Sequence, residues 1–371
     1  MLDRRLLKNF EWPILLIIIL IAIISISNLY SAIHHSIDIT GKDILTRHIY
    51  WYITGLCMML LMTTFDYRIL ENIAIPIYFF SVFLLVLVLI TGKTISGSQR
   101  WLNIGGLFSF QPSEFAKLAL PVILAKFFSA HNNINIYEYR LRDLCLPILL
   151  TVIQTILILK EPDLGTALLL LIIAGSVIFV MKLKWKSILS MIFLFIASVP
   201  ILWTYIFKDY QKMRILIFLR PEMDVLGAGY HINQSKITIG SGMLWGKGYL
   251  GGTQTHLQFL PEQHTDFIFS VLAEEWGFIG IIIIMSIFAA IIVRGISIAF
   301  NSKDQFGAIL AVGITATIFW QLIINIGMVT GLLPVVGIPC TFLSYGGSSL
   351  VTTMMSLGIL MNISMRRFMF V

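Results

Sequence analysis

The residues FLPEQHTDFIFSVLAEEWGFIG, at positions 259–280, run from a polar loop directly into an apolar helix. Asp266 lies at the junction, and Glu274 and Glu275 follow about two turns later, inside the predicted membrane span. An ionised carboxylate there is costly and usually faces a bundle interior or a water-filled cavity. Asp266 is also at a helix start, where Thr265 or Asp266 can cap free N–H groups. From the residues alone, a helix cap and a catalytic carboxylate are both open for Asp266.

The composition of the whole chain indicates a polytopic membrane protein. Of 371 residues, 58% are hydrophobic and 12% are charged, and the mean hydropathy is +0.90, more apolar surface than a soluble domain needs. The net charge of +7 is attributed to cytoplasmic loops and anionic lipid headgroups, so no nucleic-acid partner is expected. Cys57, Cys145 and Cys340 are isolated and predict neither a disulfide framework nor a metal site.

Apolar runs of bilayer length predict an all-α fold of about ten transmembrane helices in a single transmembrane domain, 1–371. The first run lacks a small-residue cleavage site and is interpreted as a retained helix. One long loop, 207–265, separates spans seven and eight. The predicted spans are 13–31, 47–64, 73–91, 114–130, 143–159, 164–181, 187–206, 267–293, 306–328 and 341–364.

The distribution of lysine and arginine predicts that both termini are cytoplasmic. With the N-terminus inside, fourteen basic residues fall on inner segments and six on short outer segments, which is the bias that cytoplasmic loops carry. The loop 207–265 is then extracytoplasmic and is left out of the comparison because long loops translocate largely regardless of charge. The residues assigned to the inner side are Arg4, Arg5, Lys8, Arg68, Lys126, Arg140, Arg142, Lys182, Lys184, Lys186, Arg294, Lys303, Arg366 and Arg367.

The unusual sequence then gathers on the outer side, which favours a site open to the outer leaflet or the periplasm. It comprises GSQRWLNIGGLFSFQPSEFAK (97–117), KEPDLGTA (160–167), the long loop, and GIPCTFLSYGGSSL (337–350). In the last of these, SYGGSS (344–349) either packs through small residues or lines the site.

Charged residues in these outer segments are the candidate site residues. Glu114 and Lys117 are three apart at the start of a span, on one helix face and close enough to pair, although Ser113 and Pro112 also fit ordinary helix initiation. Arg100, beside Trp101, suits a phosphate or a sugar at the membrane interface, or a solvated arginine next to an interfacial tryptophan anchor.

Three more charged residues complete the candidates. Asp163, in EPDLGT, is either functional or a cap of span six. Lys236 and Lys247 lie in glycine-rich stretches that match no phosphate-binding fingerprint but allow close backbone approach to a ligand. The segment 232–239 also fits a short amphipathic helix on the membrane surface. His231, His256 and His264 lack metal-ligand spacing.

Together these motifs resemble the SEDS family (shape, elongation, division and sporulation), ten-span bacterial proteins that polymerise peptidoglycan glycan strands. The resemblance rests on GSQRW (97–101), QPSEFAK (111–117), EPDLGT (161–166), LPEQHTDFIFSVLAEE (260–275) and SYGGSS (344–349), in order along nearly the whole chain. The stretches 227–242 and 246–262 are more similar to the elongation branch than to the division branch. Two positions depart from the pattern: Glu161, where a neutral residue such as Gln is expected, and Trp276, where an aliphatic residue is usual.

The resemblance implies an inner-membrane glycosyltransferase whose site faces the periplasm and uses lipid II, a disaccharide-pentapeptide on undecaprenyl pyrophosphate. It implies an inverting transfer that forms β-1,4 bonds, with Asp266 as the essential carboxylate. Arg100, Lys117, Lys236 and Lys247 are the expected pyrophosphate-binding cations, and a divalent cation (Mg or Mn) on Asp266 or Glu114 is an optional addition. A class B penicillin-binding protein and other elongation-complex proteins are the implied partners.

Two other functions remain open at this point. A lipid II flippase explains the membrane charges equally well, but it calls for functional polar groups on both leaflet sides. A non-catalytic scaffold of the elongation complex needs no carboxylate at the Asp266 junction.

Overall fold

A computed structural model describes residues 9–34, 39–95, 98–104, 108–131, 138–220, 223–224, 227–257, 259 and 263–367. Several residues used in the sequence analysis lie outside these ranges. They are Arg4, Arg5, Lys8, Gly97, residues 105–107, and residues 221–222, 225–226, 258 and 260–262 of the long loop.

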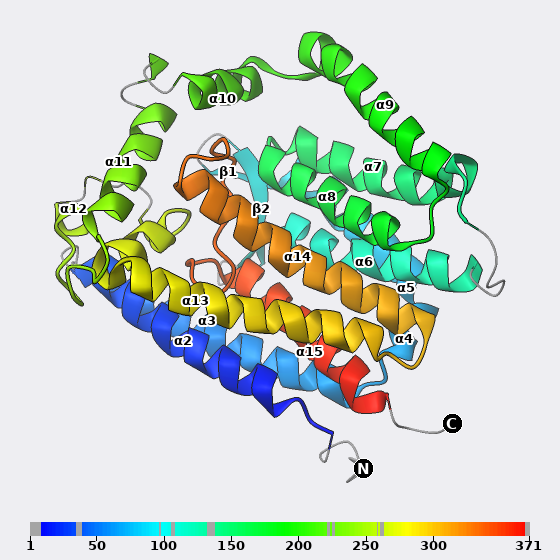
Figure 1. The fold of residues 1–371 in the computed structure, drawn as a ribbon, viewed down its shortest axis with the longest axis horizontal. Coiled ribbons are helices and arrows are strands. Elements are labelled where there is room, and N and C mark those ends of the chain that lie inside the picture. Colours follow the sequence, from blue (N-terminus) through cyan, green and yellow to red (C-terminus); the bar gives the residue numbers. More distant parts are fainter. Residues whose placement is uncertain are drawn as a thin grey trace. The chain divides into compact units, whose positions relative to one another are not determined.

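The described chain is built mainly from α-helices (Figure 1). In chain order the longer helices are α2 Trp12–Ile33, α3 Ile39–Thr64, α5 Ala74–Thr91, α6 Pro112–His131, α7 Cys145–Lys160, α8 Leu164–Val180, α9 Trp185–Ile201, α10 Asp209–Leu219, α11 Ala228–Ser241, α13 Ile268–Phe300, α14 Gln305–Val329 and α15 Gly347–Arg366. The short elements are α4 Arg68–Asn72, a 3₁₀ turn Leu141–Leu144, a π-helical turn Leu202–Ile206, α12 Thr253–His256 and the strands β1 Lys93–Ile95, β2 Ser98–Ile104 and β3 Phe108–Phe110.

Each of the ten predicted spans overlaps one of these helices, although the last, 341–364, begins six residues before α15. Within the described residues, eight helices are long and apolar enough to cross a membrane. The other two are α8, which is shorter at 17 residues, and α6, which carries Glu114, Lys117 and Lys126. The all-α membrane fold is therefore confirmed, while the count of ten spans stays a prediction.

The chain divides into two compact units, so the single transmembrane domain also stays a prediction. The first unit comprises 1–67, 217–303 and 318–371, and the second comprises 68–216 and 304–317.

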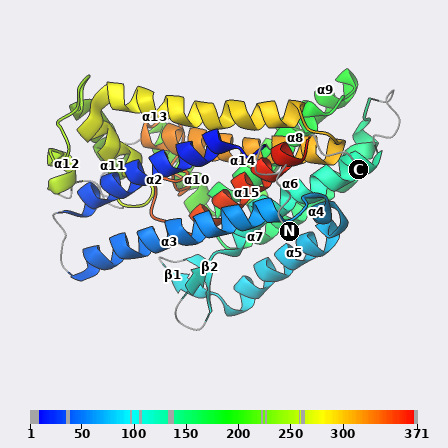
Figure 2. The same cartoon turned by 90° about the horizontal axis from the view of Figure 1, so that it is seen from below.

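In the first unit, α2, α3, α13 and α15 lie against one another (Figures 1 and 2). A Cβ at Gly55 of α3 would lie 2.3 Å from Sδ of Met354 in α15, and one at Gly358 would lie 2.3 Å from the carbonyl oxygen of Met59. Small residues therefore let α3 and α15 approach closely, as in other membrane helix pairs. Most of α15 is buried, which explains why its many hydroxyl side chains bond within the helix, as Thr352 does to the Ser348 carbonyl (2.8 Å).

In the second unit, α5, α6, α7 and α8 pack together. Side chains link α7 to α5: Gln154 Nε2 donates to Ser81 Oγ (3.2 Å), and the Tyr78 hydroxyl donates to the Leu150 carbonyl (2.8 Å). The small antiparallel sheet β1-β2-β3 begins at Lys93, just before the outer segment 97–117, and has Leu102 opposite Phe110. The sequence analysis treated this stretch only as a loop.

The long loop 207–265 is largely helical where the structure describes it. It holds α10, α11 and α12. In α11 the buried residues Ile232, Ser235 and Thr238 recur at helical spacing, and this helix packs on α13. The helix predicted at 232–239 is thus present, but its buried face lies on protein.

Candidate active site

Asp266 lies in the turn that leads into α13 and is half-buried. The N-cap position is Phe267, which makes no side-chain cap hydrogen bond, so neither Thr265 nor Asp266 occupies the predicted cap position. A Cβ at Gly337 would lie 3.6 Å from Oδ2 of Asp266, which places the carboxylate against the backbone of the 337–350 turn. The φ of +73° at Gly337 is a conformation that glycine adopts without strain.

Hydrogen bonds hold the 337–350 turn onto the residues just before α13. Ser344 Oγ donates to the Thr265 carbonyl (2.6 Å), and the Tyr345 amide donates to the His264 carbonyl (3.0 Å). The same Ser344 hydroxyl accepts a hydrogen bond from the Cys340 amide (2.7 Å). The SYGGSS motif therefore lies beside Asp266. It also packs on α3, because a Cβ at Gly347 would lie 2.2 Å from Cε2 of Trp51, so packing through small residues is observed and lining of the site stays a prediction.

Asn325, which the sequence analysis missed, positions the same junction. Its Nδ2 donates to the carbonyl oxygens of Asp266 (3.0 Å) and Ile338 (2.7 Å). One turn earlier on the same helix, Gln321 Nε2 donates to Ser349 Oγ (3.2 Å). Two amides four residues apart in the apolar run of α14 were a detectable signal, because polar side chains in membrane helices usually bond to another element.

The helix α13 is broken at Gly277, and the preceding loop fills the break. Gly277 has φ 63° and ψ −166°, so the helical bonds from Phe278 and Ile279 to the carbonyls of Glu274 and Glu275 are lost. Phe278 and Ile279 instead donate to the carbonyls of Met243 (2.9 Å) and Leu244 (3.2 Å). The backbone polar groups freed by the break are thus satisfied by protein, as membrane helices require.

The loop also supplies the donors that the two glutamate carbonyls lose. The amides of Lys247 and Gly248 donate to the carbonyls of Glu274 and Glu275, both at 3.0 Å. A Cβ at Gly246 would lie 2.1 Å from the Glu275 carbonyl oxygen. The close approach predicted from the glycine-rich stretch is therefore an approach to α13.

Glu274 is fully buried and paired with Lys247. Its Oε1 lies 2.6 Å from Lys247 Nζ and accepts from the Gln254 amide (3.0 Å), while Oε2 accepts from the Thr255 hydroxyl (2.9 Å). Lys247 also donates to Thr253 Oγ1 (2.7 Å). The charge of Lys247 is consequently balanced within the first unit, and its local role is to hold α12 and the loop against α13.

Lys236 has a different environment on α11. The side chain is exposed, and its Cε lies 2.1 Å from the position that a Cβ at Gly331 would take. Lys236 forms no ion pair with any described carboxylate. Its neighbour Ser235 anchors the helix by donating to the Val329 carbonyl (2.6 Å). Lys236 therefore offers a positive charge that no carboxylate in the described part of the chain neutralises.

In the second unit, Glu114 and Lys117 form the predicted pair at the start of α6. Glu114 Oε2 lies 2.6 Å from Lys117 Nζ, and both side chains are buried. Pro112 is the first helical residue, as predicted, whereas Ser113 Oγ is buried with no hydrogen-bond partner in the described part of the chain. Helix initiation accounts for Pro112 but not for a buried ion pair one turn later.

Arg100, on β2, lies over the turn between α7 and α8. Its Nε donates to the Glu161 carbonyl (3.3 Å) and Nη2 donates to the Pro162 carbonyl, while Nη1 lies 3.9 Å from Asp163 Oδ2. Asp163 caps α8 by accepting from the Thr166 amide (3.1 Å). The cap interpretation of Asp163 is therefore correct, and the same carboxylate also faces Arg100.

Glu161 in this turn is fully buried, and neither carboxyl oxygen has a hydrogen-bond partner among the described residues. The pKa of Glu161 is raised to about 9, because burial and the nearby Asp163 charge together outweigh the opposing charge of Arg100. Glu161 is thus a neutral acid at pH 7. A neutral carboxyl has nearly the shape of glutamine, which explains how this departure from the expected neutral residue is accommodated.

The divalent cation that was considered for Asp266 or Glu114 stays a prediction. In the described part of the chain no three His, Cys, Asp or Glu side chains gather as metal ligands. Lys117 Nζ already lies 2.6 Å from Glu114 Oε2, within hydrogen-bonding distance. We therefore derive no step through a metal.

The fold and these contacts define a helical membrane protein with carboxylates held at the starts of its helices. The sequence pattern of the FtsW, RodA and SpoVE family of cell cycle proteins matches residues 9–368. The chain belongs to this family.

Individual relatives and solved structures are similar to this chain over most of its length. It is 43% identical over 330 residues to the peptidoglycan glycosyltransferase MrdB of Escherichia coli K12, covering 88% of each chain. It is 31% identical to the peptidoglycan glycosyltransferase RodA of Treponema pallidum, covering 97% of this chain and 98% of the relative.

Among solved structures, the chain is similar to one from a peptidoglycan synthase complex that coordinates polymerization and crosslinking (TM-score 0.81, 31% identity, 97% of this chain and 98% of that one). It is also similar to the rod shape determining protein RodA of Thermus thermophilus (TM-score 0.69, 28% identity, 97% and 98% covered). The family predicted from the motifs is confirmed.

Proposed function

We propose that this chain is a peptidoglycan glycosyltransferase that polymerises glycan strands for cell elongation. Its donor is lipid II, and each transfer forms a β-1,4 bond and releases undecaprenyl pyrophosphate. The similarity to MrdB over 88% of the chain carries the assignment of the activity. The enclosure of Asp266 by the 337–350 turn and Asn325 supports a site centred on that carboxylate.

The chemistry assigns Asp266 the role of general base. The 4-hydroxyl oxygen of the acceptor sugar forms the new bond to the donor anomeric carbon, whose α-bond to the pyrophosphate oxygen breaks on the opposite face. One displacement of this kind inverts the α-linkage to β. Asp266 accepts the hydroxyl proton, and its position on a turn against Gly337 fixes the carboxylate, as a base must be fixed to act within hydrogen-bond reach.

The leaving pyrophosphate needs positive charge, and the candidate cations differ in what their surroundings leave available. Lys236 makes no ion pair in the described part of the chain and is the strongest candidate. Lys117 and Lys247 each lie 2.6 Å from a glutamate, so they contribute only if the pyrophosphate competes with that partner. Arg100 faces backbone carbonyls and Asp163.

We also propose the orientation and the partner. The excess of lysine and arginine on one set of loops supports cytoplasmic termini, with the loop 207–265 and the site facing the periplasm. The structural similarity to a chain of a synthase complex that couples polymerization to crosslinking supports a class B penicillin-binding protein as partner.

The test is polymerisation of labelled lipid II by the purified chain with its cognate class B partner, whose transpeptidase is inactivated. Asp266→Asn preserves the backbone carbonyl that Asn325 holds while removing the base. Asp209→Asn, the same substitution at an exposed position, is the matched control.

Polymer from the wild type and from Asp209→Asn, with none from an equally folded Asp266→Asn, supports the proposal. Equal polymer from all three removes Asp266 as the base. If the wild type makes no polymer but moves lipid II across vesicle membranes, the chain is a flippase.

A further inference from the structure

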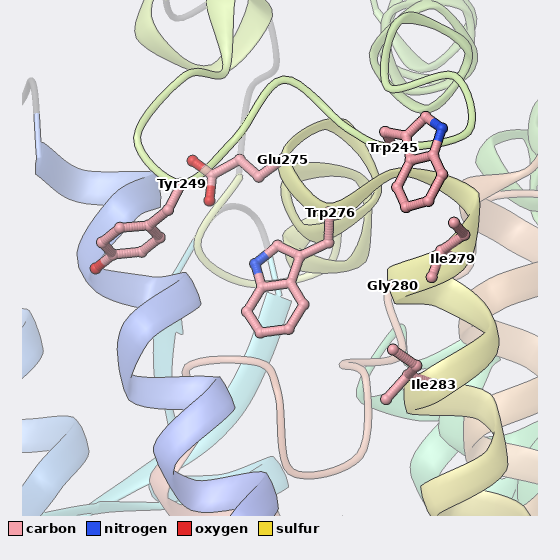
Figure 3. Close-up of a pocket in the computed structure, with 7 residues that line it drawn as sticks. All are labelled: Trp245, Tyr249, Glu275, Trp276, Ile279, Gly280 and Ile283. Carbon is pink, nitrogen blue, oxygen red and sulfur yellow. The ribbon is translucent and has the colours of Figure 1, made fainter.

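A pocket of about 270 Å³ lies where the loop meets the broken helix α13 (Figure 3). Trp245 and Tyr249 come from the loop, and the other lining residues are Glu275, Trp276, Ile279, Gly280 and Ile283 of α13. Figure 3 shows Trp276 between Tyr249 on one side and Trp245 with Ile279 on the other. The pocket is therefore walled by aromatic rings, with a carboxylate at one end and aliphatic side chains at the other.

The carboxylate of Glu275 forms no ion pair with a described lysine, arginine or histidine. Glu275 is 1% exposed, its Oε1 accepts from the Ser31 hydroxyl, and its Oε2 is buried without a hydrogen-bond partner of ordinary geometry in the described chain. Its neighbour Glu274, by contrast, is paired with Lys247. The Leu250 amide also donates to this carboxylate, but a buried carboxylate without a cation is costly, so a ligand that brings a positive charge is favoured there.

Helix length places the pocket at the edge of the membrane. From Phe278 to Arg294, which is assigned to the cytoplasmic side, α13 is about 17 residues and roughly 25 Å long, at the lower end of the roughly 17–25 residues that a membrane span needs. The residues before Gly277 then lie at the interfacial level, where tryptophan and tyrosine are enriched. Glu275 and Trp276 thus lie at headgroup depth, and Ile279 and Ile283 lie one and two turns into the acyl region.

We propose that this pocket binds the primary ammonium headgroup of a phospholipid of the phosphatidylethanolamine type. The ammonium donates to Glu275 Oε2 and lies against the faces of Trp276 and Tyr249, because aromatic rings attract cations. The acyl chain follows Ile279 and Ile283 along α13. Trp276 supplies this site at a position where an aliphatic residue was expected from the family resemblance.

Native mass spectrometry of the detergent-solubilised full chain tests the proposal. The chain is incubated with equal amounts of phosphatidylethanolamine and phosphatidylglycerol, and the bound lipids are counted. The wild type is expected to retain the ethanolamine lipid preferentially. Trp276→Leu is expected to lower that preference roughly fivefold, and Glu275→Gln is expected to abolish it. Trp12→Leu, at an exposed tryptophan that starts α2, is the matched control and keeps the wild-type preference.

Trp276 is only half-buried, so Trp276→Leu keeps the test decisive even if Glu275→Gln folds poorly. Equal retention of both lipids by the wild type, or an equal loss in Trp276→Leu and Trp12→Leu, would overturn the proposal. A wild type that retains neither lipid but whose tryptophan fluorescence responds to a lysine-rich peptide would also overturn it, in favour of a protein ligand. None of these results depends on glycosyltransferase activity.

Discussion

Glu161 gives the chain a pH-dependent stability that one substitution removes. The side chain is fully buried and its two carboxyl oxygens lack partners in the described chain. Its pKa is raised from 4.5 to about 9, mainly by burial. Below about pH 4.5 the carboxyl is protonated in both the folded and the unfolded chain, so its titration adds no pH-dependent term to the stability. Between the two pKa values the unfolded chain releases the proton and the folded chain keeps it.

Stability must therefore fall as the pH rises through this window. When the folded state binds one more proton than the unfolded state, each pH unit costs about 1.4 kcal/mol of unfolding free energy. Between about pH 5.5 and about pH 7.5 the loss is about 3 kcal/mol, or several degrees in Tm. Glu161→Gln carries no titrating group and lacks this slope. The variant is thus expected to gain stability relative to the wild type as the pH rises.

The measurement is the Tm of both proteins in dodecyl maltoside micelles at pH 5.5, 6.5 and 7.5. Glu138→Gln, the same substitution at an exposed position, controls for the loss of an acidic residue. The new amide in a buried site shifts the Tm of Glu161→Gln by an amount that does not depend on pH. The test is therefore how the Tm difference between the variant and the wild type changes with pH. A difference that stays constant or reverses with pH would refute the assignment of Glu161 as a neutral acid.

Three further results are expected. Lys247→Met leaves the Glu274 carboxylate buried and unpaired and lowers the unfolding free energy by about 3 kcal/mol. Adding Glu274→Gln is expected to restore most of this stability in thermal unfolding. A double variant as unstable as Lys247→Met would contradict the pairing. Gly277→Ala strains a φ of 63° and costs about 2 kcal/mol by the same assay, whereas Gly240→Ala, with no atom near the new Cβ, changes stability by less than about 1 kcal/mol. Asn325→Leu removes two hydrogen bonds that position the junction before α13 and lowers the polymerisation rate roughly tenfold to a hundredfold; an unchanged rate rules out its positioning role.

Hydropathy predicted the helices well because membrane spans are long and continuously apolar. The ten predicted ranges overlap helices, and motif order alone predicted the family that the comparisons confirm. The pair Glu114–Lys117 was also predictable, because residues three apart on a helix are neighbours whatever the tertiary structure. Such contacts depend only on local geometry.

Contacts between distant segments were not predictable in this way. Nothing in the sequence near Lys247 indicates that its partner is Glu274, or that the neighbouring glycines approach a helix backbone. The neutral state of Glu161 follows from its burial, which a single turn motif does not specify. The strands around Arg100 were missed because their runs are short and interrupted by glycine.

The exchange of backbone bonds at Gly277 has a consequence for how the chain can change in evolution. Residues 243–248 pair with 274–279 through four hydrogen bonds at fixed positions, so the loop and the helix are in register in the way that two β-strands are. Inserting or deleting one residue within 243–248 would misalign these bonds together. Length variation among homologues is therefore expected elsewhere in 207–265, with this six-residue segment constant in length.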